Sequence, residues 1–228
     1  HRGIPVVCVT AGLSKEEPSR LIQTTDGAAD PHVWFDPDLW ATCGKTLGEE
    51  LADFDSAGKA DYETAAMAFA EQMKQTRRDG AKQLSVVAEE RRVLVTAHDA
   101  FEYFARAFDF EVEAVQGIST DSEPGLRRIN QLIELLVQKE ISAVFTEQSV
   151  SDKNITALVA GCKSKGHTLT IGGRLFSDTA GATGTPEETL SGALLHNIHE
   201  IAVALGDGTP TDTTDDNADE VSSKESAD

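Results

Sequence analysis

Apolar residues recur at helical spacing through the first part of the chain. Between residues 39 and 54 they lie three or four positions apart, which predicts a helix with one buried face. Residues 56–90 contain no proline and consist mainly of strong helix formers, so they predict a longer helix. A helix of about 30 residues is about 45 Å long, more than a small domain needs to cover one sheet. We therefore expect this helix to join two lobes, with an inner face formed by Tyr62, Ala66, Phe69, Met73, Leu84 and Val87.

From residue 91 onward, short apolar runs alternate with amphipathic stretches. The short runs predict strands, and the amphipathic stretches predict helices. The expected strands cover residues 92–96, 112–115, 143–146 and 168–171, and the expected helices cover residues 98–108, 124–139, 152–164 and 189–205. Such alternation is typical of an α/β fold with a parallel, doubly wound sheet.

The two ends of the sequence have patterns of their own. Residues 4–10 form an apolar run rich in Val, which predicts a buried parallel strand, and residues 14–31 are polar with Gly and Pro, which predicts a loop. Because the sequence opens on the run into a strand, we expect an N-terminal truncation, and no signal peptide is visible. Residues 206–228 are mostly Asp, Thr, Ser and Glu, which predicts a disordered acidic tail.

The composition adds a strong negative charge to this picture. Of 228 residues, 39 are acidic and 20 are basic, which gives a formal charge of −19. This field repels nucleic acid and favours cations, although adaptation to a salty habitat explains it equally well. The three cysteines form no CxxC pair, and their odd number excludes a complete disulfide framework. No apolar stretch approaches the roughly 18 residues of a membrane span.

Polar side chains follow several of the expected strands. In doubly wound sheets, ligands bind beyond the carboxyl ends of the strands. His98, Glu147 and Asp178 each follow an expected strand, and His32 lies in the loop before the first long helix. Imidazoles and carboxylates together suit zinc, and a larger carboxylate share suits manganese. Each residue also has a structural explanation: a lone His is more often a packed side chain, Asp178 can cap a turn, and Glu147 can form a salt bridge.

Six strings resemble, in the same order, segments of the metal-binding solute-binding proteins of zinc and manganese ABC importers, the TroA/ZnuA-like family. The similarity extends over residues 1–205. The strings are DPHVWFDP at 30–37, TAHDAFEYF at 96–104, QGISTDSEPG at 116–125, FTEQS at 145–149, LFSD at 175–178 and HNI at 196–198.

Carried over position by position, the resemblance implies that His32, His98 and Asp178 are metal ligands and that Glu147 lies beside the site. It also implies a further ligand His in a segment that precedes His1. A His at position 98, where some manganese- and iron-binding relatives have Glu, favours zinc. Residues 19–30 contain no His, although zinc-dedicated relatives often carry a His-rich insertion there. The expected ion is therefore Zn²⁺ or Mn²⁺.

The resemblance also implies a fold and a function. The fold is two-lobed α/β, with doubly wound parallel sheets joined by a long rigid helix. Residues 1–55 would be the remnant of an incomplete N-terminal lobe, 56–90 the linking helix, 91–205 the C-terminal lobe and 206–228 the acidic tail. His32 would come from the first lobe, and His98 and Asp178 from the second.

The implied function is that of the extracytoplasmic substrate-binding component of an ABC transporter, periplasmic or lipid-anchored at the cell surface. The partners would be a divalent metal ion and a membrane permease, and nucleic acid would not be a partner. The protein would be a monomer, and it would not be an enzyme.

The residues alone leave two other functions open. A metal-dependent hydrolase could use Glu147 as its base, but no HExxH, GxSxG or glycine-rich phosphate loop is present. An adhesin or interaction protein with a structural metal is the other, and reversible metal binding would argue against it. His167, His196 and His199 are expected to be structural or surface residues.

Overall fold

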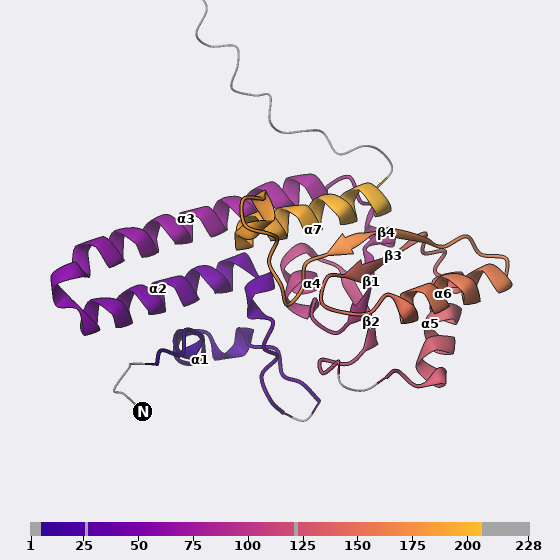
Figure 1. Ribbon diagram of the computed structural model, residues 1–228, viewed down its shortest axis with the longest axis horizontal. Helices are drawn as coiled ribbons and strands as arrows, with labels where there is room; N and C mark the ends of the chain where they lie inside the picture. Colours follow the sequence, from indigo (N-terminus) through magenta and orange to yellow (C-terminus); the bar gives the residue numbers. More distant parts are fainter. Residues whose placement is uncertain (1–5, 26, 121–122, 207–228) are drawn as a thin grey trace, which may run out of the picture.

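The computed structural model describes residues 6–25, 27–120 and 123–206, which form helices and short parallel strands (Figure 1). Short 3₁₀ helices lie at Pro18–Arg20 (η1), Val33–Phe35 (η2), Ser56–Gly58 (η3), Glu89–Arg91 (η4) and Pro186–Glu188 (η5). The strands are β1 (Val93–His98), β2 (Glu111–Gln116), β3 (Ala143–Glu147) and β4 (Thr170–Leu175). The α-helices are α1 (Ala11–Glu16), α2 (Pro37–Phe54), α3 (Lys59–Leu84), α4 (Glu102–Phe108), α5 (Leu126–Gln138), α6 (Lys153–Ser164) and α7 (Leu190–Leu205).

The strands pair in parallel, which confirms the predicted fold class. β1 pairs with β2 from Val93 opposite Glu111 onward, and β3 pairs with β4 from Ala143 opposite Thr170 onward. β1 and β3 lie next to each other between these pairs. Every residue of β1 and β3 is buried, as expected for strands covered on both faces. The carboxyl ends of β1 and β3 therefore meet at one edge.

Helices cover both faces of the strands, because alternate residues of one strand enter different cores. Leu94 belongs to a core that includes α4 and α7, whereas Val93 and Val95 belong to a second core with α5 and α6. Side chains of successive strand residues point to opposite faces, so one apolar run supplies both cores. This is the doubly wound arrangement.

The long helix α3 is shorter than predicted, with 26 residues and a length of about 39 Å. It lies beside α2, and the pair extends away from the strands (Figure 1). One face of its second half packs against α4 and α7, and Gly80 permits the close approach: a Cβ there would lie 2.6 Å from Ile198 and 2.9 Å from Phe108. In its first half, Tyr62 and Phe69 are only half-buried and line an apolar groove of about 270 Å³ shared with α2.

Two predictions for the N-terminal region are wrong. Residues 6–8 of the expected strand 4–10 have no regular structure, and Val6 is 95% exposed, because no neighbouring strand in the described residues pairs with them. The expected loop 14–31 begins within α1, whose Leu13 is fully buried. Residues 1–5 lie outside the described residues.

Several boundaries differ from the predictions at the functional edge. β1 extends to His98, α4 begins only at Glu102, and β4 runs from Thr170 to Leu175 instead of 168–171. β4 was hard to predict because its centre, Gly172 and Gly173, has no apolar side chain. Side chains at those glycines would meet Ala204 and Glu200 of α7, so the glycines let the helix pack closely.

The predicted acidic tail, apart from Gly206, lies outside the described residues. Among the described residues, no helix has both the length and the apolar composition of a membrane span.

Candidate metal centre

His32, His98 and Asp178 converge at the carboxyl ends of the strands. One nitrogen or oxygen from each lies within 4.8 Å of the others. Nε2 of His32 is 3.6 Å from Oδ1 of Asp178, and Nε2 of His98 is 3.3 Å from Oδ2 of Asp178. Two ligands about 2.1 Å from a tetrahedral ion lie about 3.4 Å apart, so these spacings fit one ion between the side chains.

His98 ends β1, and its side chain is completely buried. Glu147, the last residue of β3, accepts a hydrogen bond from the backbone N–H of His98 (2.8 Å) and lies 2.6 Å from its Nδ1. The other ring nitrogen, Nε2, is buried and has no hydrogen-bond partner. A buried polar atom without a partner is costly, so this nitrogen suits an ion that would bind there.

His32 lies at the start of the 3₁₀ helix η2 and is 4% exposed. Oδ1 of Asp30 accepts a hydrogen bond from the backbone N–H of His32 and also lies 2.8 Å from its Nδ1. The rings of His32 and His98 meet edge to face, with centroids 5.6 Å apart. Both rings therefore present Nε2 to Asp178 from neighbouring positions.

Asp178 is the exposed member of the group, with 42% of its side chain accessible. It lies in the loop after β4, which is attached to the body at two points. The buried Asn197 of α7 accepts from the backbone N–H of Phe176 (2.8 Å) and donates to its carbonyl (2.7 Å). The hydroxyls of Ser149 and Ser177, 2.9 Å apart, join this loop to the loop after β3.

The segment that carries His32 is fastened to α4. The hydroxyl of Tyr103 accepts from the backbone N–H of Ile22 (3.0 Å) and donates to the carbonyl of Asp30 (3.3 Å). The buried Asp36, which caps α2, also accepts from Arg106 at 3.2 Å. Because only residues 99–101 separate β1 from α4, these contacts fix the position of His32 relative to His98.

The surrounding carboxylates control the protonation of His98. Burial alone lowers its pKa, but the hydrogen bond and charge of Glu147, together with the charges of Asp178 and Asp99, outweigh burial and raise the pKa. Burial, reinforced by the charge of Asp30, raises the pKa of Asp99. The local field is thus negative and favours a cation.

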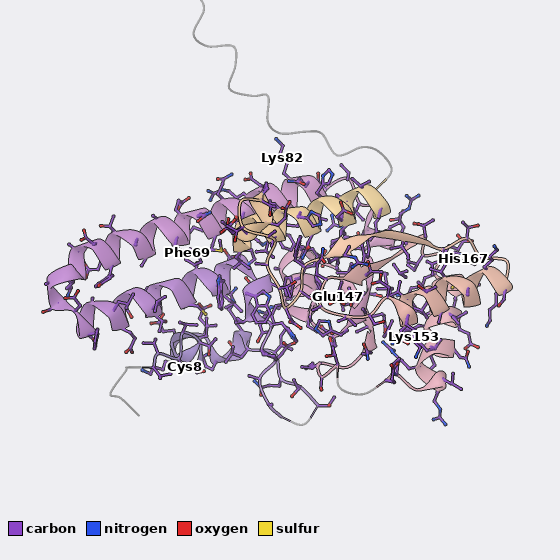
Figure 2. The ribbon with its side chains drawn as sticks, viewed as in Figure 1. Cys8, Phe69, Lys82, Glu147, Lys153 and His167 are labelled. Atoms are coloured by element: carbon purple, nitrogen blue, oxygen red, sulfur yellow. The ribbon has the colours of Figure 1, made fainter. Side chains whose placement is uncertain are left out.

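The other polar residues from the sequence lie apart from this group. Both oxygens of Glu147 are engaged by His98, so Glu147 lies beside the site. Nε2 of His167 is 2.6 Å from the carbonyl of Ile141, and Figure 2 shows His167 at the periphery, away from Glu147. Nε2 of His196 is 3.1 Å from the carbonyl of Arg174, and His199 is exposed.

Sequence reasoning missed Asp30 and Asn197 as contributors to the site. Both belong to strings that resemble the family, DPHVWFDP and HNI. Their hydrogen bonds depend on the turn at η2 and on the packing of α7 beside β4, which no local pattern specifies.

Comparisons with known proteins identify the family of the chain. The chain is 42% identical over 188 residues to the manganese-binding lipoprotein MntA of Bacillus subtilis and 38% identical over 187 residues to the zinc-binding protein TroA of Treponema pallidum. Each match covers 82% of this chain and 61% of the relative, so the chain spans about three fifths of their length.

The structure of the periplasmic zinc-binding protein TroA from Treponema pallidum superposes with a TM-score of 0.84 at 36% identity, and the match covers 90% of this chain and 73% of that one. The family model for "Zinc-uptake complex component A periplasmic" matches residues 1–204. The match takes in β1–β4 and His32, His98 and Asp178, and the chain therefore belongs to this zinc-uptake component A family.

Proposed function

We propose that this protein is the substrate-binding component of an ABC importer and captures Zn²⁺ or Mn²⁺ as its cargo. One observation carries the proposal: Nε2 of His98 is buried without a hydrogen-bond partner and faces Asp178 beside His32. In this proposal His32 and His98 each give a nitrogen to the ion, and Asp178 gives a carboxylate oxygen. Two nitrogens with a carboxylate suit zinc and accommodate manganese.

The relatives support the partner and the location. Their names describe manganese- and zinc-binding proteins, and several are substrate-binding lipoproteins of metal ABC transporters. We infer that this protein works outside the cytoplasm, in the periplasm or lipid-anchored at the cell surface, and delivers the ion to a membrane permease. We infer further that it acts as a monomer and binds no nucleic acid, which its charge of −19 would repel.

The site favours transport over hydrolysis. A hydrolase needs a free general base near the metal-bound water. Both oxygens of Glu147, the candidate base, already accept or face hydrogen-bond donors of His98. We therefore propose that the protein is not an enzyme.

The site also favours transport over an adhesin with a structural metal. Hydrogen bonds from protein groups hold both histidines, so the site does not need an ion to keep its shape. Release of the ion is then compatible with a folded protein.

Elemental analysis and calorimetry of the full-length protein, with zinc and manganese in parallel, test the proposal. We expect one equivalent of metal that a chelator removes while the circular dichroism spectrum stays native. His98→Ala should weaken binding at least 100-fold, whereas His199→Ala, an exposed control on α7, should not. Absence of bound metal, or unfolding when metal is removed, would contradict a transport function.

A further inference from the structure

Both candidate ligand histidines are held by a carboxylate in the same way. In each case one carboxylate group binds both the backbone N–H and the ring Nδ1 of the same histidine. The distances are 2.8 and 2.8 Å for Asp30 with His32, and 2.8 and 2.6 Å for Glu147 with His98. We infer that Asp30 and Glu147 are positioning residues that fix both rings as the Nδ1–H tautomer, with Nε2 directed at the ion, before the ion arrives. The role of the ion rests on the proposed function.

The chemistry of the carboxylate determines the tautomer. An ionised carboxylate only accepts hydrogen bonds. Nδ1 of His32 and of His98 lies 2.8 and 2.6 Å from a buried carboxylate, whereas Nε2 lies 3.6 and 3.3 Å from the exposed Asp178, so a neutral imidazole carries its proton on Nδ1. The lone pair of Nε2 is then free for a metal, which is the arrangement that carboxylate partners impose on metal-bound histidines. Nε2 of His98, which makes no hydrogen bond, is the nitrogen that this tautomer leaves free.

The second hydrogen bond of each carboxylate fixes the orientation of the ring. The same carboxylate contacts both the backbone N–H and the ring Nδ1 of the histidine, so it holds the ring in a fixed orientation relative to the main chain. His32, His98, Asp30 and Glu147 are at most 4% exposed, so water does not compete for these bonds. Rotation of either ring would break a buried hydrogen bond.

The two carboxylates reach this arrangement from different local structures. Asp30 lies two residues before His32 and uses a single oxygen, Oδ1, for both bonds. Glu147 lies on the neighbouring strand β3 and uses one oxygen for each bond. A substitution to the amide therefore has different consequences at the two sites.

At position 147, an amide has only one oxygen for two donors, so its N–H₂ group must face either the ring or the backbone N–H. At position 30, the amide oxygen can replace Oδ1 for both donors. We expect Glu147→Gln to disturb the His98 tautomer, Asp30→Asn to preserve the His32 tautomer, and Asp30→Ala to release it.

Asp99 provides a matched control for charge alone. It follows His98 directly, and its charge acts on the pKa of His98. Its buried Oδ1, however, has no hydrogen-bond partner. Asp99→Asn therefore removes a nearby charge without removing a hydrogen bond to either ring.

The experiment is a long-range ¹H–¹⁵N correlation spectrum of histidine-labelled, metal-free, full-length protein, at a pH where both rings are neutral. Zinc and manganese affinities of the same variants are measured by calorimetry. We expect Nδ1–H signals for His32 and His98 in the unaltered protein and in Asp99→Asn. Glu147→Gln and Asp30→Ala should each change the signal of their own histidine and weaken binding about 10- to 100-fold.

Two results would overturn the inference: an Nε2–H or mixed tautomer in the unaltered metal-free protein, or an affinity loss in Asp99→Asn as large as in Glu147→Gln. The spectrum needs no metal, so it separates this inference from the proposed function. Nδ1–H tautomers in a protein that binds neither metal would contradict the proposed function and leave the hydrogen-bonded arrangement intact.

Discussion

The candidate ligand His98 is paired with a buried carboxylate. Oε2 of Glu147 lies 2.6 Å from Nδ1 of His98, and neither side chain has access to solvent. The residue type at position 98 must therefore be compatible with the buried carboxylate of residue 147. An imidazole N–H satisfies that carboxylate, whereas an acidic ligand would repel it.

We predict that His98→Glu destabilises the protein by about 2–4 kcal/mol, because it brings two buried carboxylates into contact. Glu147→Gln in the same chain should recover at least half of this loss by replacing one of the charges. Urea unfolding in the presence of a chelator, followed by circular dichroism, measures both variants. Equal stabilities of His98→Glu and the unaltered protein would show that the pair is not coupled.

The sequence predicted which side chains could meet but not how they are held. His98 and Glu147 follow expected strands, so the rule for ligand sites in doubly wound sheets brings them to one edge. The spacing of 66 residues between His32 and His98 gives no such indication, and the resemblance supplied it. The role of Asp30 depends on the turn into η2. The assignment of His32, His98 and Asp178 as metal ligands remains a prediction.

Among the elements, α4 links the two candidate histidines. It follows β1 after a short turn, and its Tyr103 and Arg106 hold the segment that carries His32. The ring of Tyr103 is fully buried, so its hydroxyl makes the link from inside the core. The helix that follows His98 thus positions His32, the other candidate histidine ligand.

We predict that Tyr103→Phe lowers the free energy of unfolding by about 1–2 kcal/mol, because it leaves the N–H of Ile22 and the carbonyl of Asp30 without their partner. It should also weaken metal binding by loosening His32. Tyr62→Phe is the control, since that hydroxyl binds the half-buried Asp55 away from the site. Chemical denaturation and calorimetry measure the two effects, and equal losses in both variants would refute the link.

The helix α3 depends on close packing at Gly80. Alanine is the better helix former by about 1 kcal/mol. Its Cβ would nevertheless lie 2.6 Å from Ile198 and 2.9 Å from Phe108. Overpacking of a core typically costs about 1–3 kcal/mol, so we predict a net destabilisation for Gly80→Ala.

Thermal unfolding tests this prediction against Gln72→Ala, an exposed change in the same helix that should stay within about 0.5 kcal/mol. A stabilised Gly80→Ala variant would indicate that α3 and α7 can move apart at little cost. The sequence indicated the helix and most of its extent. It showed Gly80 only as a weak helix former, because the need for a glycine there depends on the packing of α7.

Across the whole molecule, the first segment and the α/β region share one core. Leu13, Phe35 and Leu39 belong to the same cluster as Phe101 and Phe104. The division into a remnant lobe at 1–55, a linking helix at 56–90 and a lobe at 91–205 stays a prediction. In the described residues, His32 is held by contacts with α4, and Asp178 is the ligand candidate on an exposed loop.

The core explains which elements were predictable. Buried strands such as β1 have an apolar pattern that is visible in the sequence, and they were located to within two residues. Residues 6–10 have a similar pattern without a neighbouring strand in the described part of the chain, so local composition alone gave the wrong element.

We predict that bound metal stabilises the whole protein without being required for its fold. At a free metal concentration about 100 times the dissociation constant, binding adds about 2.7 kcal/mol to the free energy of unfolding. Differential scanning calorimetry should therefore show one cooperative transition with chelator and one with metal, and the transition with metal should lie at the higher temperature. A protein without any cooperative transition in chelator would require a structural role for the ion.

The most direct test is a crystal structure of the full-length protein with zinc or manganese, with anomalous data collected at the absorption edge of the metal. We predict one strong anomalous peak about 2.0–2.2 Å from Nε2 of His32, Nε2 of His98 and a carboxylate oxygen of Asp178. A peak at another position, or coordination through Nδ1 of either histidine, would contradict the metal centre described here.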